Sequence, residues 1–240
     1  YSGLAINSGQ SSAEGIEITL NTTPVQTADF NWDLSVNFAT LNKYVDFLAE
    51  GIETRVLDSW MSWYGLQTQE RVGEEWGVIV GRKKAKTADG TDILTSSGRP
   101  TWENNQILGN LLPDFTGGLT SQMNYKNWDL SLGFDWQAGG KFYSTSNMFS
   151  YYSGLHEDTV GLNDKGNPKR DSTSNGGGVH VTGVDASGNP VDTYMSASFY
   201  YYIHYFGNHE HWLYDASYVK LRTARLGYNF PKTALDNTPF

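Results

Sequence analysis

The feature that most constrains how this sequence can fold is a regular alternation of apolar and polar residues. In one segment, for example, Ile16, Ile18 and Leu20 alternate with polar residues. Successive side chains of a β-strand point to opposite faces, so a period of two predicts strands with one apolar and one polar face. The alternating segments are 15–22, 32–38, 119–125, 130–136 and 217–230. We therefore expect an all-β, antiparallel fold.

Short connections join four of these segments in pairs. The connections lie around residues 23–28, between the first two segments, and around 126–128, between the next two. Connections this short predict two antiparallel hairpins. In the last segment, Val219 and Leu221 are out of phase with Leu226. That change of phase predicts either a β-bulge or a stretch that stands clear of a bilayer.

The length of the segments distinguishes two kinds of β-protein. With their flanking residues, these segments would form strands of about 9–14 residues, which suits a tilted strand crossing an apolar layer of ~30 Å, whereas strands of soluble sandwiches have about five or six residues. Trp32, Tyr125, Trp128 and Trp136 stand near segment ends, where the aromatic girdle of a membrane barrel would place them. A transmembrane β-barrel segment is favoured, and a soluble carbohydrate-binding β-sandwich remains the alternative.

The polar faces of the predicted strands carry several acidic and amide side chains. These residues are Glu17, Asp33, Asn37, Asp129 and Asp135. In a barrel they would line the lumen or contact a plug, because a charged side chain is costly on the lipid side.

Composition excludes several classes of function. The formal net charge of −9 argues against nucleic acid as a partner, because phosphates need a basic surface. The absence of Cys excludes disulfides and thiolate metal sites. No run of 18 apolar residues occurs, so we expect no membrane-spanning helix. A membrane barrel is compatible with the absence of long apolar runs, because only alternate residues of barrel strands face lipid.

Two long polar stretches, 42–112 and 140–213, interrupt the alternating segments. Loops of this size are normal on the outer face of a barrel, where one set of connections is long and the other short. If both short connections lie in the periplasm, each stretch must begin and end outside the cell. We predict two extracellular excursions, with local β-structure at 76–82 and in a hairpin that starts with 180–184 and turns at 185–189.

Several phrases of the sequence resemble the SusC/RagA-like TonB-dependent outer-membrane transporters. The phrases are GIEITLN at 15–21, FNWDLSVNF at 30–38, LGN at 108–110, PDFTGGL at 113–119, YKNWDLS at 125–131, YDASYVKLR at 214–222 and LGY at 226–228 with Pro231. They occur in the order of that family and span nearly the whole chain. The chain thus resembles the C-terminal part of the family's barrel.

The resemblance implies a plugged barrel of about 22 strands that imports oligosaccharides, other glycans or peptides. It implies a SusD-like surface lipoprotein and TonB as partners, and the lipid bilayer of the bacterial outer membrane as surroundings. The family's plug and TonB-contacting segment have no counterpart in residues 1–240, and neither have its last barrel strands. We expect the chain to be a piece of a longer barrel.

Aromatic residues of the two excursions are candidates for contact with cargo. Their rings offer flat apolar faces with polar rims, which suit sugar rings and peptides alike. The candidates are Trp60, Trp63, Tyr64, Tyr200, Tyr201, Tyr202 and Trp212. The alternative is that these rings pack loop against loop, or against the partner lipoprotein.

The remaining chemical motifs are weak. His204, His209 and His211 lack the spacing of a recognised metal motif, so a structural or chance cluster is favoured over a metal site. The stretches 164–167 and 185–189 lack the other ligand positions of a calcium loop and are predicted to be turns. We expect no enzyme activity and no cofactor, although a secreted glycan hydrolase with an acidic pair hidden in the loops is a second alternative.

Overall fold

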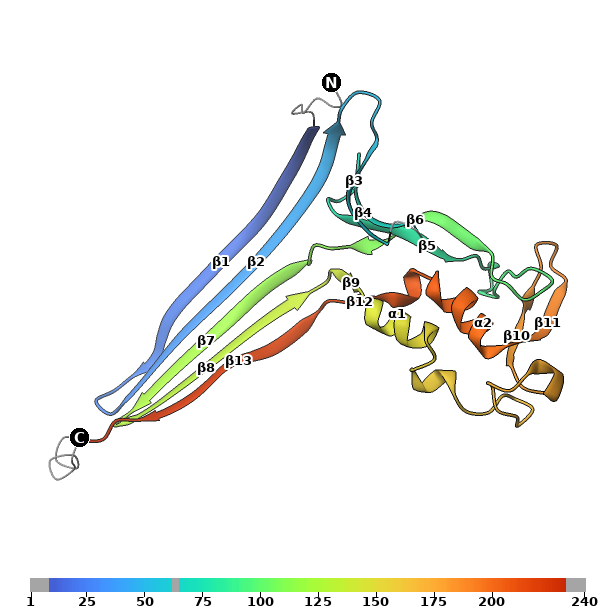
Figure 1. Cartoon of the computed structure of the whole chain (residues 1–240). Coiled ribbons are helices and arrows are strands. Elements are labelled where there is room, and N and C mark those ends of the chain that lie inside the picture. Colours follow the sequence, from blue (N-terminus) through green and yellow to red (C-terminus); the bar gives the residue numbers. More distant parts are fainter. Residues whose placement is uncertain (1–8, 62–64, 232–240) are drawn as a thin grey trace, which may run out of the picture.

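The computed structural model describes residues 9–61 and 65–231, with side chains for all of these except 59–61. A long, curved sheet joins a separate lobe at one of its ends (Figure 1). The strands of the long sheet are β1 (Gly9–Gln26), β2 (Phe30–Leu48), β7 (Phe115–Tyr125), β8 (Trp128–Ala138) and β13 (Tyr218–Tyr228). Their spatial order is β1-β2-β7-β8-β13, and all neighbours are antiparallel. The prediction of an antiparallel, mainly β chain is confirmed.

The register gives this sheet one apolar and one polar face. Ile18 pairs with Phe38, and Leu119 pairs with Phe134, so these apolar side chains share a face. On the opposite face lie the predicted polar residues Glu17, Asp33, Asn37, Asp129 and Asp135. The alternation read from the sequence is therefore kept across all five strands.

A bulge in β13 explains its change of phase. Leu221 pairs with Phe134 and Thr223 with Gly133, so Arg222 is the additional residue between two consecutive partners. The bulge returns the later apolar residues, such as Leu226, to the face that already holds Leu221. Of the two explanations predicted for this strand, the structure has the bulge.

The two ends of the sheet differ in their connections. Residues 27–29 join β1 to β2, and 126–127 join β7 to β8, so both predicted hairpins are confirmed. The long connections leave from the other end of the sheet (Figure 1). Strand β2 continues to Leu48, so the first excursion, 42–112, begins with the last residues of that strand.

The first excursion forms a second antiparallel sheet with the strand order β3-β4-β5-β6. Its strands are β3 (Thr54–Met61), β4 (Leu66–Arg71), β5 (Val78–Lys84) and β6 (Trp102–Asn110). Strand β5 overlaps most of the stretch 76–82, so the expectation of local β-structure there is confirmed.

The second excursion combines short strands with short helices. Its strands are β9 (Lys141–Tyr143), β10 (Val179–Val184), β11 (Pro190–Met195) and β12 (Leu213–Asp215). Its helices are α1 (Thr145–Tyr152), α2 (Ala197–Tyr201), the π-helix η4 (Tyr202–Phe206) and the 3-10 turns η2 (Glu157–Thr159), η3 (Thr173–Asn175) and η5 (Glu210–Trp212). The β10–β11 pair turns at 185–189, which confirms the predicted hairpin.

The helices were not expected from the sequence, because their signals are short and local. The side chain of Ser144 accepts a hydrogen bond from the backbone N–H of Asn147 and so caps α1. Met148 and Tyr151, three residues apart on α1, are both buried. No helix in the described ranges is both long and apolar enough to cross a membrane.

The two excursions pack around a shared hydrophobic core. Leu66 and Ile79 of the first excursion belong to the same buried cluster as Met148, Phe206 and Trp212 of the second. A smaller cluster joins Leu94 to Val181, Val191 and Met195. Backbone hydrogen bonds also cross between the excursions, from Leu94 N to Val184 O at 2.8 Å and from His209 N to Arg82 O at 3.1 Å. The excursions therefore form one lobe.

Candidate functional site

The long sheet exposes its apolar face. Leu20 of β1 is 54% exposed, and Leu226 of β13 is 67% exposed. Exposed aromatic rings lie at the short-turn end of this face, where Trp128 and Tyr228 stand 4.7 Å apart between ring centroids and Tyr125 lies opposite Trp128. Aromatic rings at the edge of an apolar band are typical of a membrane–water interface.

The apolar band has the height of a bilayer core. On β8 the apolar band runs from Trp128 to Trp136, a stretch of nine residues. A tilted strand crosses a bilayer in about 9–11 residues. Phe38 and Phe115 mark its outer edge, with ring centroids 5.5 Å apart. Beyond that edge, β1 and β2 continue with residues such as Glu14, so both strands extend past the band.

Two details show how this face avoids voids and unpaired polar groups. Gly117 lies opposite Trp136, and a Cβ at Gly117 would come within 2.5 Å of the indole ring. The absence of a side chain at Gly117 thus leaves room for the indole ring of Trp136 to lie over β7. Ser121, a buried polar residue of this face, accepts a hydrogen bond of 2.9 Å from Nε1 of Trp32. Its hydroxyl is therefore satisfied without water.

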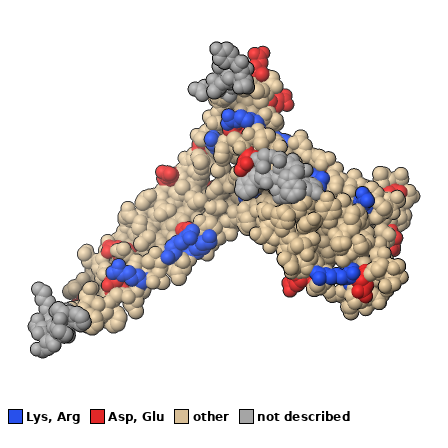
Figure 2. All heavy atoms as spheres, in the orientation of Figure 1, with Lys and Arg blue, Asp and Glu red and all other residues tan. Residues whose placement is uncertain are grey.

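The polar face carries a ladder of charged and hydroxyl groups. Arg222 of β13 donates to both carboxylate oxygens of Asp135, at 2.7 and 2.8 Å, and the hydroxyl of Tyr218 donates to the same carboxylate. Arg225 lies 3.2 Å from Asp129. Figure 2 shows basic and acidic side chains close together on the sheet. Such a face suits a water-filled or protein-filled interior and is costly against lipid.

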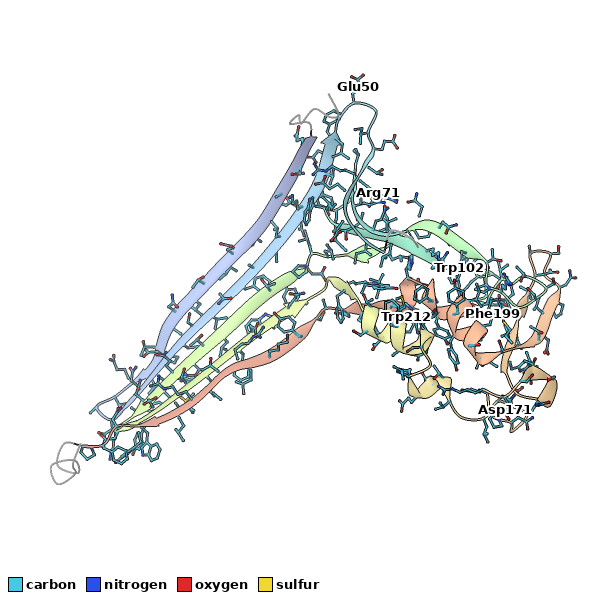
Figure 3. The ribbon with its side chains drawn as sticks, in the orientation of Figure 1. Glu50, Arg71, Trp102, Asp171, Phe199 and Trp212 are labelled. Atoms are coloured by element: carbon cyan, nitrogen blue, oxygen red, sulfur yellow. The ribbon has the colours of Figure 1, made fainter. Side chains whose placement is uncertain are left out.

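The lobe encloses part of the predicted aromatic set. Trp212 is 1% exposed and Tyr201 is 6% exposed, and both belong to the shared core (Figure 3). Tyr200 is half-buried and packs against that core. Tyr202 is 39% exposed. Of these four residues, Tyr202 is the most exposed.

The side chains of the other predicted aromatic residues lie outside the described part of the structure. Trp63 and Tyr64 lie in the gap at 62–64. Trp60 belongs to β3, but its side chain is not among those described. Contact of these three residues with cargo stays a prediction.

A further aromatic surface on the lobe was missed by sequence reasoning. Phe149 and Tyr152 of α1 are exposed, and they contact the rings of Tyr202 and Phe206 of η4. Ring centroids in this group, which we call the outer ridge, are 4.9–6.3 Å apart. The available signal was the three-residue spacing of Phe149 and Tyr152, which places both on one side of a helix.

The buried histidines are structural. Nε2 of His204 lies 2.8 Å from the carbonyl oxygen of Gly98, and Nδ1 of His209 accepts the backbone N–H of Arg82 at 3.1 Å. Burial, the largest cause, and a neighbouring cation, Lys84 for His204 and Arg82 for His209, together lower the pKa of each imidazole to about 4. Both are therefore neutral at pH 7. In the described ranges, no three His, Cys, Asp or Glu side chains are arranged to hold a metal ion.

The stretches 164–167 and 185–189 form the predicted turns. In the second, a carboxylate oxygen of Asp185 accepts the backbone N–H groups of Ser187 and Asn189. Hydrogen bonds from the side chain of Asn189 are the largest cause that lowers the pKa of Asp185, and the backbone N–H groups lower it as well. In the first, Asn163 accepts the N–H groups of Lys165 and Asn167.

An antiparallel sheet with an exposed apolar face, a polar face, short turns at one end and large excursions at the other is typical of the wall of an outer-membrane β-barrel. Comparison of sequences agrees with this class. The chain is 24% identical to the TonB-dependent receptor P3 of Formosa agariphila, over 99% of the chain and 24% of the receptor. It is 25% identical to the TonB-dependent receptor P26 of the same organism, over 94% of the chain and 23% of the receptor. No family model matches the chain.

Solved structures show the same fold. The RagAB peptide transporter superposes with a TM-score of 0.57 at 16% identity, over 97% of this chain and 24% of the other. The RagAB peptide importer in its closed-closed state gives a TM-score of 0.58, again at 16% identity with the same coverage. The predicted resemblance to SusC/RagA-like TonB-dependent transporters is confirmed. The chain spans about a quarter of the length of these curated relatives.

The relatives also indicate the cellular location of this chain. TonB-dependent receptors are proteins of the outer membrane of Gram-negative bacteria, so the predicted outer-membrane location is confirmed. An exposed apolar face within a two-faced sheet is the physical counterpart of that location.

Proposed function

We propose that this chain forms part of the barrel wall and the extracellular lobe of a TonB-dependent importer of nutrients. The observation that carries the proposal is the two-faced sheet, in which exposed apolar residues such as Leu20 and Leu226 lie on one side and paired charges on the other. The apolar side faces lipid, and the polar side faces the barrel interior. The exposure of Leu20 and Leu226 counts against the soluble sandwich, which would bury this face against a second sheet.

The barrel is closed by strands outside the described residues. Strands β1 and β13 are the edges of the sheet, and an open edge in a bilayer leaves backbone groups without partners. The relatives are about four times as long as this chain, which is enough for a plugged barrel of about 22 strands. The names of the relatives support import that is driven by energy coupling through TonB.

The lobe at the outer mouth contacts the cargo and a SusD-like lipoprotein. The outer ridge supports this part of the proposal, because it combines exposed rings of Phe149, Tyr152 and Tyr202 on two packed helices. Such rings stack on sugar rings and pack on apolar peptide side chains. Peptide cargo is favoured over oligosaccharide by the similarity to a peptide transporter. Trp60, Trp63 and Tyr64 remain further candidates for the same contact.

The orientation of the sheet can be tested in the full-length transporter with single cysteines. The chain itself has no Cys, so Leu20→Cys and Thr19→Cys give adjacent labels on opposite faces. A fluorophore at Leu20 should be quenched by a lipid-borne quencher, whereas one at Thr19 should not. Equal quenching at both positions would refute the barrel wall.

The cargo role of the lobe can be tested by uptake. Cells carrying Tyr202→Ala or Tyr152→Ala should need several-fold more peptide for half-maximal uptake, with little change in the maximal rate. Tyr44→Ala is the matched control, because Tyr44 of β2 is equally exposed but lies outside the ridge. If oligosaccharide uptake is affected and peptide uptake is not, the cargo is a glycan. If neither uptake changes, the ridge has no role in cargo binding.

A further inference from the structure

One histidine of the lobe lies between two carboxylates. His180 of β10 places Nδ1 2.8 Å from an oxygen of Asp164 and Nε2 2.8 Å from an oxygen of Asp192. Asp192 belongs to β11, the other strand of the hairpin, whereas Asp164 belongs to the preceding loop, 161–168. The imidazole therefore bridges the hairpin and the loop.

Both contacts require a charged imidazole. A neutral imidazole has one N–H donor and one acceptor nitrogen, while an ionised carboxylate accepts hydrogen bonds without donating any. With both ring nitrogens at hydrogen-bond distance from carboxylates, the doubly protonated form satisfies the two contacts together. After loss of a proton, one nitrogen lone pair faces a carboxylate oxygen, and that contact becomes repulsive.

Tyr194 keeps Asp164 in the ionised, accepting form. Its hydroxyl donates to both oxygens of Asp164, at 2.6 and 2.8 Å. This hydrogen bond is the largest cause that lowers the pKa of Asp164, and the charge of His180 lowers it as well. The ring of Tyr194 stacks on the imidazole at 4.6 Å with an interplanar angle of 4°. The phenol thus fixes the carboxylate and the orientation of the imidazole together.

We propose that His180 is a proton-dependent clamp that holds the loop 161–168 on the β10–β11 hairpin at the outer surface. The charged groups that face it are Asp164 and Lys165 of the loop and Asp192 of β11, and Tyr194 is the titratable group on its ring face. Lys165 lies 3.5 Å from the centre of the Tyr194 ring, on the loop side of the same cluster.

The direction of the effect follows from the charge. The protonated imidazole closes the clamp and loss of its proton loosens it, so the clamp is tighter in acid than in alkali. The loop does not unfold when the clamp opens, because Nδ2 of Asn163 also donates to the carbonyl oxygens of Gly176 and Gly178. The expected change is therefore a local loosening, and it does not depend on the import function.

Amide hydrogen exchange of the full-length transporter in detergent tests the clamp. After correction for the intrinsic effect of pH, exchange in peptides covering 161–178 should become about two- to fivefold faster between pH 5.5 and 8.5. In the His180→Gln variant, the same peptides should exchange at the faster rate at both pH values. Peptides from β1 and β2 provide an internal control in each sample.

A second variant separates the clamp from a general loss of structure. Asp192→Asn keeps a side chain of the same size but removes one negative charge, so the pH step should shrink while β10 and β11 remain protected. The proposal is overturned if the wild-type peptides show no pH step, or if His180→Gln retains the full step.

Discussion

Arg222 and Asp135 face each other across strands β13 and β8, where the guanidinium donates from Nε and Nη2 to the two carboxylate oxygens at 2.7 and 2.8 Å. The bulge at Arg222 makes this geometry possible, because it turns the side chain of the additional residue onto the polar face. The pair thus links the backbone irregularity of β13 to the charge pattern on the polar face of the sheet.

Replacement of Arg222 by Gln should lower the stability of the sheet slightly. Both side chains are accessible to solvent, so the pair is screened, and the loss should shrink as the salt concentration rises. Thermal unfolding of the full-length transporter at low and high salt measures this difference. Arg222→Lys, which keeps the charge but not the two parallel hydrogen bonds, should fall between wild type and Arg222→Gln. A loss that is unchanged by salt would contradict an electrostatic role.

The two faces of β8 should respond oppositely to a new charge. Leu132→Arg puts a cation on the apolar face, which costs about 2–4 kcal/mol near the middle of a bilayer, and should impair assembly in the outer membrane. Ser131→Arg puts the same side chain on the polar face and should be tolerated. Heat-modifiable migration of the assembled barrel on gels measures the outcome. Equal tolerance at the two positions would refute the assignment of the faces.

Truncation of Trp212 should open the lobe. Its indole is enclosed by both excursions, and Nε1 donates to the carbonyl oxygen of Tyr205 at 2.7 Å. Removal of a buried ring of this size costs about 3–5 kcal/mol. We expect Trp212→Ala to make the lobe sensitive to a protease that leaves the wild type intact. Tyr202→Ala, which removes a partly exposed ring, should stay resistant.

Acid should destabilise the lobe through its buried histidines. Because burial lowers the pKa of His204 and His209 to about 4, the unfolded chain binds protons more readily than the folded lobe does. The stability that depends on the neutral imidazoles is present above about pH 6.5 and is lost as the pH falls towards 4. The loss is up to about 3 kcal/mol for each histidine.

Unfolding of the lobe at pH 7 and pH 4.5 measures this effect. The acid-induced loss should be smaller in His209→Gln than in the wild type, because the variant has one fewer group to protonate. A variant that loses as much stability in acid as the wild type would exclude His209 from the response. The clamp at His180 has the opposite sign, since it is strongest when its imidazole is charged.

The strands and faces of the long sheet were predictable because they are encoded locally. Period-2 alternation places Ile18 and Glu17 on opposite faces wherever the strand lies, and the short connections require antiparallel hairpins. The out-of-phase start of β13 indicated an irregularity, for which a bulge was one of two explanations, and the structure places the bulge at Arg222. The aromatic candidates were harder to interpret, because an exposed ring and a buried ring look alike in a sequence. Trp212 proved to be enclosed, and Phe149 and Tyr152 formed the exposed ridge.

The sequence by itself determined the five strands, their apolar and polar faces, and the end of the sheet at which the excursions leave. Tertiary structure alone decided how the two excursions pack into one lobe. Its contacts join residues far apart in the chain, such as Arg82 with His209 and Gly98 with His204. The pairing of such distant groups follows from packing and burial. A local alternation of residues in the sequence does not encode such contacts. The same holds for His180, whose two carboxylate partners meet only when the loop folds back on the hairpin.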